Sequence, residues 1–300
     1  MQIFIRISFV LITVVFFLSG CSNISAPSST LSEGRVEMAQ TPITDDPGDR
    51  RFQGKFIWND LLTSNPLSVG KFYEQLFGWK IDYQGQYAVV RNKGKLIAGI
   101  LKVEASDGVA KSGIWLPSVS VSNVDEAVSR VTANGGKVLN GPVDMQRRGR
   151  AVLIRDPQQA ELVLLNSAAG DPADVEAQMG DWLWDEIWTD TPERIAEFYK
   201  IVLGYDETSS RDNYDILMHK EKWRAGIRHI PADNKHKLWV PVVRVADPDA
   251  IVQRVEELGG VVWIAPDEAP SQGDTALISD TSGALLLIQR WPAHTDKGEL

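Results

Sequence analysis

Two stretches of this sequence nearly repeat each other: "KFYEQLFGWK" at residues 71–80 and "EFYKIVLGYD" at residues 197–206. Both have the apolar spacing of an amphipathic helix and end in a glycine followed by an aromatic residue. Phe72 of the first stretch returns as Phe198 of the second, 126 positions later. Repetition over such a distance indicates that a whole module has been duplicated.

The duplication extends over most of the chain. Asp156 returns as Asp280, 124 positions later, so a deletion of two loop residues accounts for the changed interval. One module therefore covers residues 53–167 and the other covers residues 181–292, and the small, acidic segment 168–180 joins them. A chain of 300 residues is also longer than most single domains, which agrees with two folded units.

Each module contains two segments with the spacing of amphipathic helices. Three of these four segments begin at a proline, whose missing backbone N–H costs nothing in the first turn of a helix: Pro66, Pro192 and Pro248. One β-like run precedes each expected helix and about three follow it. The sequence thus predicts an α+β protein built from four βαβββ units.

The composition excludes one class of partner. The chain is 43% apolar and 24% charged, as ordinary globular proteins are. Its net charge of −9 would repel a phosphate backbone, so nucleic acid is not an expected partner. A short basic stretch, Arg147, Arg148 and Arg150, is interpreted as a solvated surface turn.

The start of the chain is expected to be a targeting segment. Residues 1–20 combine an early positive charge with an apolar run that is too short to span a membrane comfortably. The run ends in "LSGC", which resembles the lipobox of bacterial lipoproteins and implies lipidation of Cys21, the only cysteine. The alternatives are an ordinary cleaved signal peptide or an N-terminal anchor helix. We expect residues 21–52 to be a flexible tether, because they lack apolar periodicity, and residues 293–300 to be a tail.

Lipidation at this cysteine would place the protein in the bacterial cell envelope, on the periplasmic side or at the outer membrane of a diderm host. Its partners would then be the membrane, reached through the N-terminal lipid, and a small organic molecule. The sequence does not indicate the oligomeric state.

Three patterns together resemble the vicinal oxygen chelate superfamily, which includes glyoxalases, bleomycin resistance proteins and extradiol dioxygenases. They are W-x-D-L-x-T on the first strand, FY followed by LFGW on the first helix, and DP-x-x-A before the last strand. The resemblance covers residues 53–292. It implies two tandem modules with cup-shaped mixed sheets, in which the cup holds the ligand. It does not fix the activity, because one fold serves many functions.

The resemblance also provides a test for a metal. Metal-using members hold a divalent ion with His and Glu side chains that point into the cup. The matching positions here are apolar or aromatic: Trp58, Leu116 and Val163 in the first module, and Trp184, Val240 and Leu287 in the second. The four histidines are expected to be surface or partly buried residues. We therefore expect neither a metal ion nor another cofactor.

Asp60 and Glu186 are the polar residues that repeat on the first strand of each module, two positions beyond a repeated tryptophan and on the same face as it. Either carboxylate could accept hydrogen bonds from a ligand, or act as a base if burial raises its pKa. The alternative is a carboxylate satisfied by backbone N–H groups at the rim of the cup.

Tryptophan is frequent in the expected strands, and indole rings bind aromatic and cationic molecules. The candidate ligand contacts are Trp58, Trp184, Trp115 and Trp239. Core packing is the alternative role of the first two, and a contact between units is the alternative role of the last two.

Three functions are consistent with these observations. The first is a membrane-tethered lipoprotein that binds a small organic molecule without metal. The second is an enzyme of lyase or isomerase type that uses Asp60 or Glu186 as a base, or that uses a metal held by other residues. The third is a non-catalytic envelope interaction protein.

Overall fold

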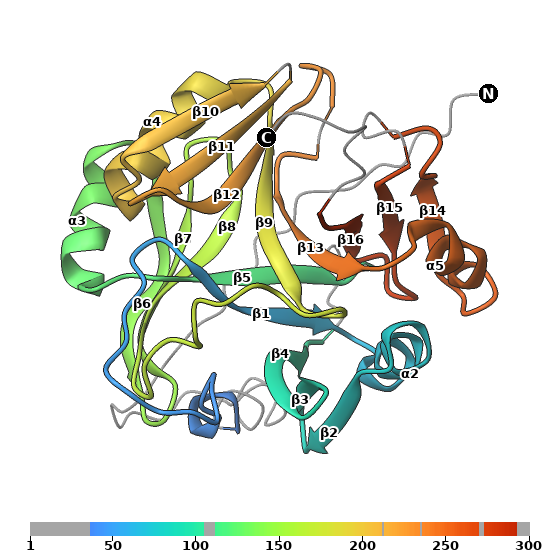
Figure 1. Cartoon of the computed structure of the whole chain (residues 1–300). Coiled ribbons are helices and arrows are strands. Elements are labelled where there is room, and N and C mark those ends of the chain that lie inside the picture. Colours follow the sequence, from blue (N-terminus) through green and yellow to red (C-terminus); the bar gives the residue numbers. More distant parts are fainter. Residues whose placement is uncertain (1–36, 105–111, 212, 235, 270–272, 293–300) are drawn as a thin grey trace.

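The computed structural model describes residues 37–104, 112–211, 213–234, 236–269 and 273–292. These residues form two sheets of eight strands, one from each module (Figure 1). The expected signal peptide, Cys21 and the tail lie outside the described residues. In the described part of the chain, no helix is both long enough and apolar enough to cross a membrane.

Module 1 folds as two βαβββ units. The first unit consists of β1 (Phe56–Thr63), α2 (Pro66–Phe77), β2 (Lys80–Gln84), β3 (Tyr87–Asn92) and β4 (Lys95–Lys102). The second unit consists of β5 (Ile114–Ser120), α3 (Val124–Ala133), β6 (Lys137–Met145), β7 (Gly149–Arg155) and β8 (Glu161–Ser167). The strand order is β2-β3-β4-β1-β5-β8-β7-β6. The sheet is mixed, because β1 is parallel to β4 and antiparallel to β5.

Module 2 repeats this arrangement. Its first unit consists of β9 (Trp182–Thr189), α4 (Pro192–Leu203), β10 (Glu207–Arg211), β11 (Tyr214–His219) and β12 (Lys222–His229). Its second unit consists of β13 (Trp239–Val245), α5 (Pro248–Val255), β14 (Val261–Ile264), β15 (Thr275–Ser279) and β16 (Leu285–Arg290). The strand order, β10-β11-β12-β9-β13-β16-β15-β14, is that of module 1. The predicted α+β fold of four βαβββ units is confirmed.

Most of the residues that were expected to begin and end helices do so in the structure. The Asn65 side chain accepts a hydrogen bond from the N–H of Ser68 at the start of α2, and Pro66 occupies the first turn. Gly78 ends α2 with a φ of 72°, a conformation that side chains disfavour. Thr191 differs, because its side chain makes no capping hydrogen bond to α4.

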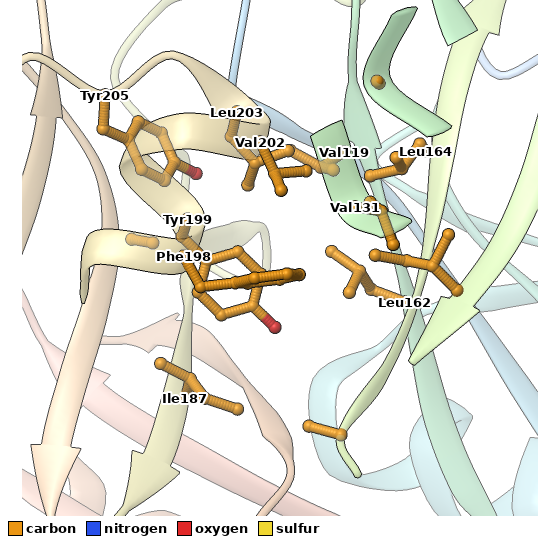
Figure 2. Packing of buried hydrophobic residues seen from close by; sticks show 14 of the residues in the cluster. Val119, Val131, Leu162, Leu164, Ile187, Phe198, Tyr199, Val202, Leu203 and Tyr205 are labelled. Atoms are coloured by element: carbon orange, nitrogen blue, oxygen red, sulfur yellow. The ribbon is translucent and has the colours of Figure 1, made fainter. Parts of the chain in front are cut away.

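The helices of one module pack on the helices of the other, α2 on α5 and α3 on α4 (Figure 1). Figure 2 shows the core around α3 and α4, in which Phe198 and Tyr199 of α4 lie opposite Val131 and Leu162 of module 1. A second shared core surrounds α2 and α5. The hydrophobic effect therefore holds the two modules together at both ends of their interface.

Residues 37–52 contact module 1. Met38 and Ile43 are buried among core residues of its sheet. The Glu37 carboxylate accepts hydrogen bonds at 2.8 and 3.0 Å from two consecutive backbone N–H groups at the start of β3. Isolated apolar residues in a polar segment give no periodicity, so the sequence carries no signal for this contact. The expected tether is thereby limited to residues 21–36, which lie outside the described part of the chain.

Candidate functional site

The cup of module 1 contains a cavity of about 50 Å³. Most of its walls are apolar side chains of the sheet, and Met38 of the N-terminal segment contributes to them. Its polar lining residues are Asp60, Ser118 and Arg148. Strand alternation explains the place of Asp60, because Leu62, two residues further along β1, lines the same cavity.

Asp60 is engaged by other side chains of the cup. Its Oδ1 accepts a hydrogen bond from Trp58 Nε1 at 2.9 Å and another from the Tyr87 hydroxyl at 2.6 Å. Arg148 Nη2 lies 3.6 Å from the same oxygen and donates to the Tyr87 hydroxyl at 2.6 Å. Side chains, and not the backbone N–H groups considered from the sequence, therefore satisfy this carboxylate. The arrangement holds Asp60 in a fixed position beside the cavity.

Arg148 corrects the interpretation of the basic turn as surface. This residue is only 2% exposed, and its guanidinium carbon lies 4.9 Å from the centre of the Trp58 ring. Burial lowers the pKa of Arg148, but the nearby Tyr87 and Asp60 outweigh burial and the pKa is raised. Three arginines close together look alike in the sequence. Only the fold of the turn between β6 and β7 decides which of them points inward.

Module 2 builds a similar site around the repeated carboxylate, with its indole and its cation at other positions. Glu186 Oε1 accepts a hydrogen bond from Trp188 Nε1 at 2.7 Å. Arg228 of β12 donates to both carboxylate oxygens, from Nε to Oε1 at 2.5 Å and from Nη2 to Oε2 at 3.0 Å. The indole here follows the carboxylate by two residues, whereas Trp58 precedes Asp60 by two. Neither Trp188 nor Arg228 was predicted as a site residue from the sequence, because they do not occupy repeated positions.

The two repeated tryptophans of the first strands have different surroundings. Trp58 is fully buried in the first cup. Trp184 is half-buried, and its ring centre lies 5.3 Å from that of Trp291 and 6.4 Å from that of Trp223. Its Nε1 is buried near Tyr214 but makes no hydrogen bond of normal geometry with any described residue.

Trp115 and Trp239 lie between the modules and not in the cups. Trp115 donates a 3.2 Å hydrogen bond to the Tyr73 hydroxyl, and Trp239 donates a 2.9 Å hydrogen bond to the Tyr199 hydroxyl. Both indoles are buried in cores that the two modules share. Their position agrees with the alternative role, a structural contact, rather than with ligand binding.

The positions matched to metal ligands present hydrocarbon to the cups. Leu116 and Val163 line the cavity of module 1, and Val240 and Leu287 belong to the core of the second cup. Among the residues that the structure describes, no three His, Cys, Asp or Glu side chains come together as a possible metal site. The donor groups present in either cup therefore do not fit a divalent ion.

Comparison with known families agrees with this architecture. Residues 61–164 match the model of the glyoxalase/bleomycin resistance protein/dioxygenase superfamily. Module 1 is a glyoxalase-superfamily domain. Module 2 has the same order of strands and helices, so the chain consists of two tandem modules with the glyoxalase-superfamily fold.

Several relatives match almost over their whole length. CFP32 of Mycobacterium bovis, a protein named as a glyoxylase, is 29% identical over 246 residues, which cover 79% of this chain and 94% of CFP32. The anthracycline biosynthesis protein DauV of Streptomyces sp. strain C5 is 27% identical over 267 residues, which cover 81% of this chain and 97% of DauV.

Solved structures share the fold at low identity. The Mn(II)-bound glyoxalase of Novosphingobium aromaticivorans gives a TM-score of 0.57 at 13% identity and covers 80% of this chain and 82% of its own. A variant of homoprotocatechuate 2,3-dioxygenase from B. fuscum gives a TM-score of 0.54 at 10% identity and covers 83% of this chain and 73% of its own.

Proposed function

We propose that this glyoxalase-superfamily protein binds a small organic molecule in the cup of module 1 without a metal ion. One observation carries the proposal. Leu116 and Val163 occupy positions that match metal ligands in the superfamily, and they line a cavity that is also lined by a buried ion pair, Asp60 and Arg148. Apolar walls with a few fixed polar groups are typical of small-molecule sites. The names of the relatives, a glyoxylase and an anthracycline biosynthesis protein, also support a small organic ligand.

The geometry limits what this cup would accept. A cavity of about 50 Å³ takes a small molecule or one group of a larger molecule. The buried pair offers a donor in Arg148 and an acceptor in Asp60, so a ligand with a carbonyl or hydroxyl group would find a partner there. A larger ligand would have to displace Met38, which belongs to the N-terminal segment and to the cavity wall.

Metal content tests the proposal directly. The full chain, purified in detergent, is exposed to Zn, Mn, Ni or Fe(II), dialysed and examined by elemental analysis, with the Mn(II)-bound glyoxalase named above as a positive control. We expect no stoichiometric metal in this chain and metal in the control. A compound that then shifts the melting temperature should do so equally with and without EDTA. Stoichiometric metal that supports turnover would disprove the proposal.

We also propose that a lipid on Cys21 anchors the protein in the bacterial envelope. The support is the apolar run that ends in "LSGC". Mass spectrometry of the N-terminal peptide should find a lipidated cysteine, and Cys21→Ser should move the protein from the membrane fraction to the soluble fraction. An unmodified cysteine in membrane-bound protein would exclude this anchor.

An enzyme of lyase or isomerase type that uses Asp60 as a base is the second candidate. The observation in its favour is that Asp60 lines the cavity, whereas the two hydrogen bonds that Oδ1 accepts weigh against it. Turnover of a compound that binds the cup would support this candidate if Asp60→Asn abolishes it while binding and folding persist. Glu186→Gln, in the other module, is the matched control.

A further inference from the structure

A larger hollow lies between the modules. Its volume is about 440 Å³, within the roughly 300–1,000 Å³ that small-molecule sites have. The starts of β1 and β4 in module 1, the starts of β9 and β12 in module 2, and the linker all contribute to its wall. We call this hollow the inter-module crevice. Asp60, Glu186 and Arg148 are not among its lining residues, whereas Trp58, the indole that donates to Asp60, is one of them.

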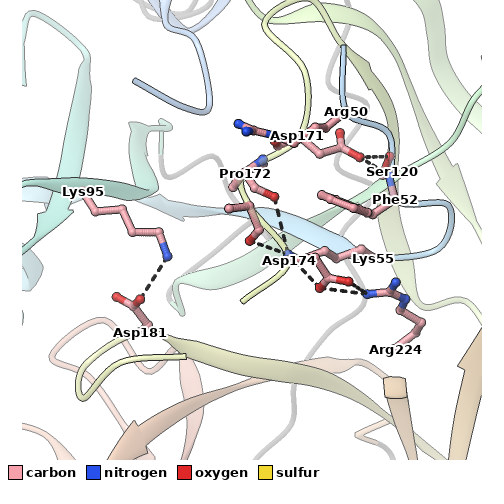
Figure 3. Close-up of polar contacts among 11 residues, drawn as sticks. Arg50, Phe52, Lys55, Lys95, Ser120, Asp171, Pro172, Asp174, Asp181 and Arg224 are labelled. Carbon is pink, nitrogen blue, oxygen red and sulfur yellow. Dashed lines mark hydrogen bonds and ion pairs between the residues drawn. The ribbon is translucent and has the colours of Figure 1, made fainter. Parts of the chain in front are cut away.

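Cationic side chains gather in the inter-module crevice. Lys55 and Arg224 both pair with Asp174, at 3.1 and 3.0 Å, so two cations share one carboxylate. Figure 3 shows this group facing a second pair, Lys95 and Asp181, which is 3.0 Å apart. Burial lowers the pKa of Lys55, Asp174 opposes the lowering, and the neighbouring Arg224 and Lys95 lower it further. Lys55 Nζ also donates to the carbonyl oxygens of Ala173 and Pro172, at 2.9 and 3.5 Å, so Asp174 is the one carboxylate that it pairs with among the described residues.

The remaining acidic residues of the wall do not pair with Lys55. Glu176 pairs at 2.7 Å with Arg244, which lies outside the wall. The Asp185 side chain is fully buried beside Asn59 but makes no hydrogen bond of normal geometry. Burial raises the pKa of Asp185 to about 8, so this carboxyl group is mostly uncharged at pH 7. Lys222, another lining residue, is exposed. With Asp185 uncharged, the wall carries four cationic side chains, those of Lys55, Lys95, Lys222 and Arg224, against three carboxylates, and the excess is positive.

An unpaired donor and several aromatic rings lie on the same wall. Nε of Arg224 is buried and has no acceptor among the described residues. The rings of Trp184, Trp223 and Trp291 form one group, with centres 5.3 to 6.4 Å apart. Trp223 remains 46% exposed, so part of its surface is available to a ligand. Buried donors without acceptors are costly unless a ligand supplies the acceptor.

We infer that the inter-module crevice binds an aromatic carboxylate. The carboxylate group offsets the positive excess and accepts hydrogen bonds from Lys55 and Arg224. The ring packs on the indoles of Trp184 and Trp223. The crevice is a different hollow from the cavity of the first cup, and Trp58 lies next to both, because it lines the crevice and donates to Asp60.

Isothermal titration calorimetry of the full chain in detergent tests this inference, with 1-naphthoate as the probe. We expect binding of one naphthoate per chain. Trp223→Ala should weaken it about tenfold or more, because a stacking surface is lost. Trp263→Ala is the matched control: Trp263 on β14 is 47% exposed, against 46% for Trp223, but does not line the crevice. Lys55→Met should also weaken binding, whereas Lys71→Met on α2 should not.

The charge of the probe separates the possible outcomes. We expect 1-naphthylmethylammonium, which has the same ring with a cationic group, to bind at least about tenfold more weakly than naphthoate. Absence of naphthoate binding would overturn the inference, and so would an affinity that Trp223→Ala leaves unchanged. Tighter binding of the ammonium probe would also overturn it, because the site would then select cations through Asp185.

Discussion

The Tyr73 hydroxyl of module 1 donates a 2.9 Å hydrogen bond to Oδ2 of Asp280 in module 2. The reciprocal hydrogen bond, from Tyr199 of module 2 to Oδ2 of Asp156 in module 1, also measures 2.9 Å. Each tyrosine comes from one copy of the repeated stretch, and each aspartate precedes the last strand of the opposite module. The two copies therefore bind each other's modules in the same way.

The phenylalanine that precedes each tyrosine crosses the interface too. A Cβ atom built on Gly260 would lie 2.7 Å from the Phe72 ring, and one built on Gly136 would lie 3.0 Å from the Phe198 ring. Each of these glycines is the second of a Gly-Gly pair, so it leaves room for the ring of the other module. The duplicated stretch thus forms an interface between two modules as well as a helix within each.

Tyr73→Phe should destabilise the protein by about 1–3 kcal/mol, because Asp280 and the Trp115 indole both lose a buried partner. Urea unfolding measures this loss. The control is Tyr83→Phe, which removes only an exposed 3.3 Å hydrogen bond to the carbonyl of Pro66 and should change stability by less than about 0.5 kcal/mol. Equal losses in both variants would contradict a special role of the Tyr73 contact.

Asp185→Asn should remove part of the pH dependence of stability. Burial raises the pKa of Asp185 to about 8 in the folded protein, whereas an unfolded aspartate has a pKa of about 3.9. Between these values the folded state holds a proton that the unfolded state has released. The free energy of unfolding therefore falls as pH rises through this window, by about 1.4 kcal/mol per pH unit.

Urea unfolding at pH 5.5 and pH 7.5 checks this prediction. Relative to wild type, Asp185→Asn should gain about 3 kcal/mol between the two pH values. Asparagine is a compatible side chain, because Asn59 occupies the equivalent position of module 1. The exposed Asp267→Asn should show no such gain. A constant difference between Asp185→Asn and wild type would mean that Asp185 titrates as an ordinary carboxyl group.

Arg148→Met should destabilise module 1 by about 3–5 kcal/mol, because it leaves the buried Asp60 without its cation. Adding Asp60→Asn should recover part of this loss, since no uncompensated charge then remains. Thermal and urea unfolding of the four members of this cycle give the coupling. Arg150→Met is the control, because Arg150 forms exposed ion pairs that contribute about 1 kcal/mol or less. If the stability losses of Arg148→Met and Asp60→Asn simply add in the double variant, the two side chains do not stabilise each other.

Gly99→Ala should distort the first cup and lower the free energy of unfolding by about 1–3 kcal/mol or more. A Cβ atom at Gly99 would lie 1.8 Å from the Tyr87 hydroxyl oxygen and 2.4 Å from Oδ1 of Asp60, so the hydrogen bond between them could not persist. Near-UV circular dichroism and thermal unfolding report the change. Gly48→Ala is the control, because its added methyl group would touch only Arg50, at 4.0 Å. If Gly99→Ala changes neither the spectrum nor the melting temperature, the tyrosine and the carboxylate can move apart at no cost.

Part of the candidate site could be predicted from the sequence. Trp58 and Asp60 are two residues apart on one strand, and this spacing alone puts them on one face of the sheet, where they form a hydrogen bond. Arg148 and Arg228 could not be predicted as their counterparts. Each arginine reaches its carboxylate from another strand or turn, and such contacts depend on how strands are ordered in the sheet.

By itself, the sequence determined the duplication and the four βαβββ units, because apolar periodicity, prolines and glycines act locally along the chain. Only the tertiary structure decided that Met38 covers the first cup and that the inter-module crevice gathers Lys55, Arg224 and the indoles. These arrangements join residues that are far apart in sequence and of unremarkable type. Their proximity follows from the packing of one module on the other, which no local pattern encodes.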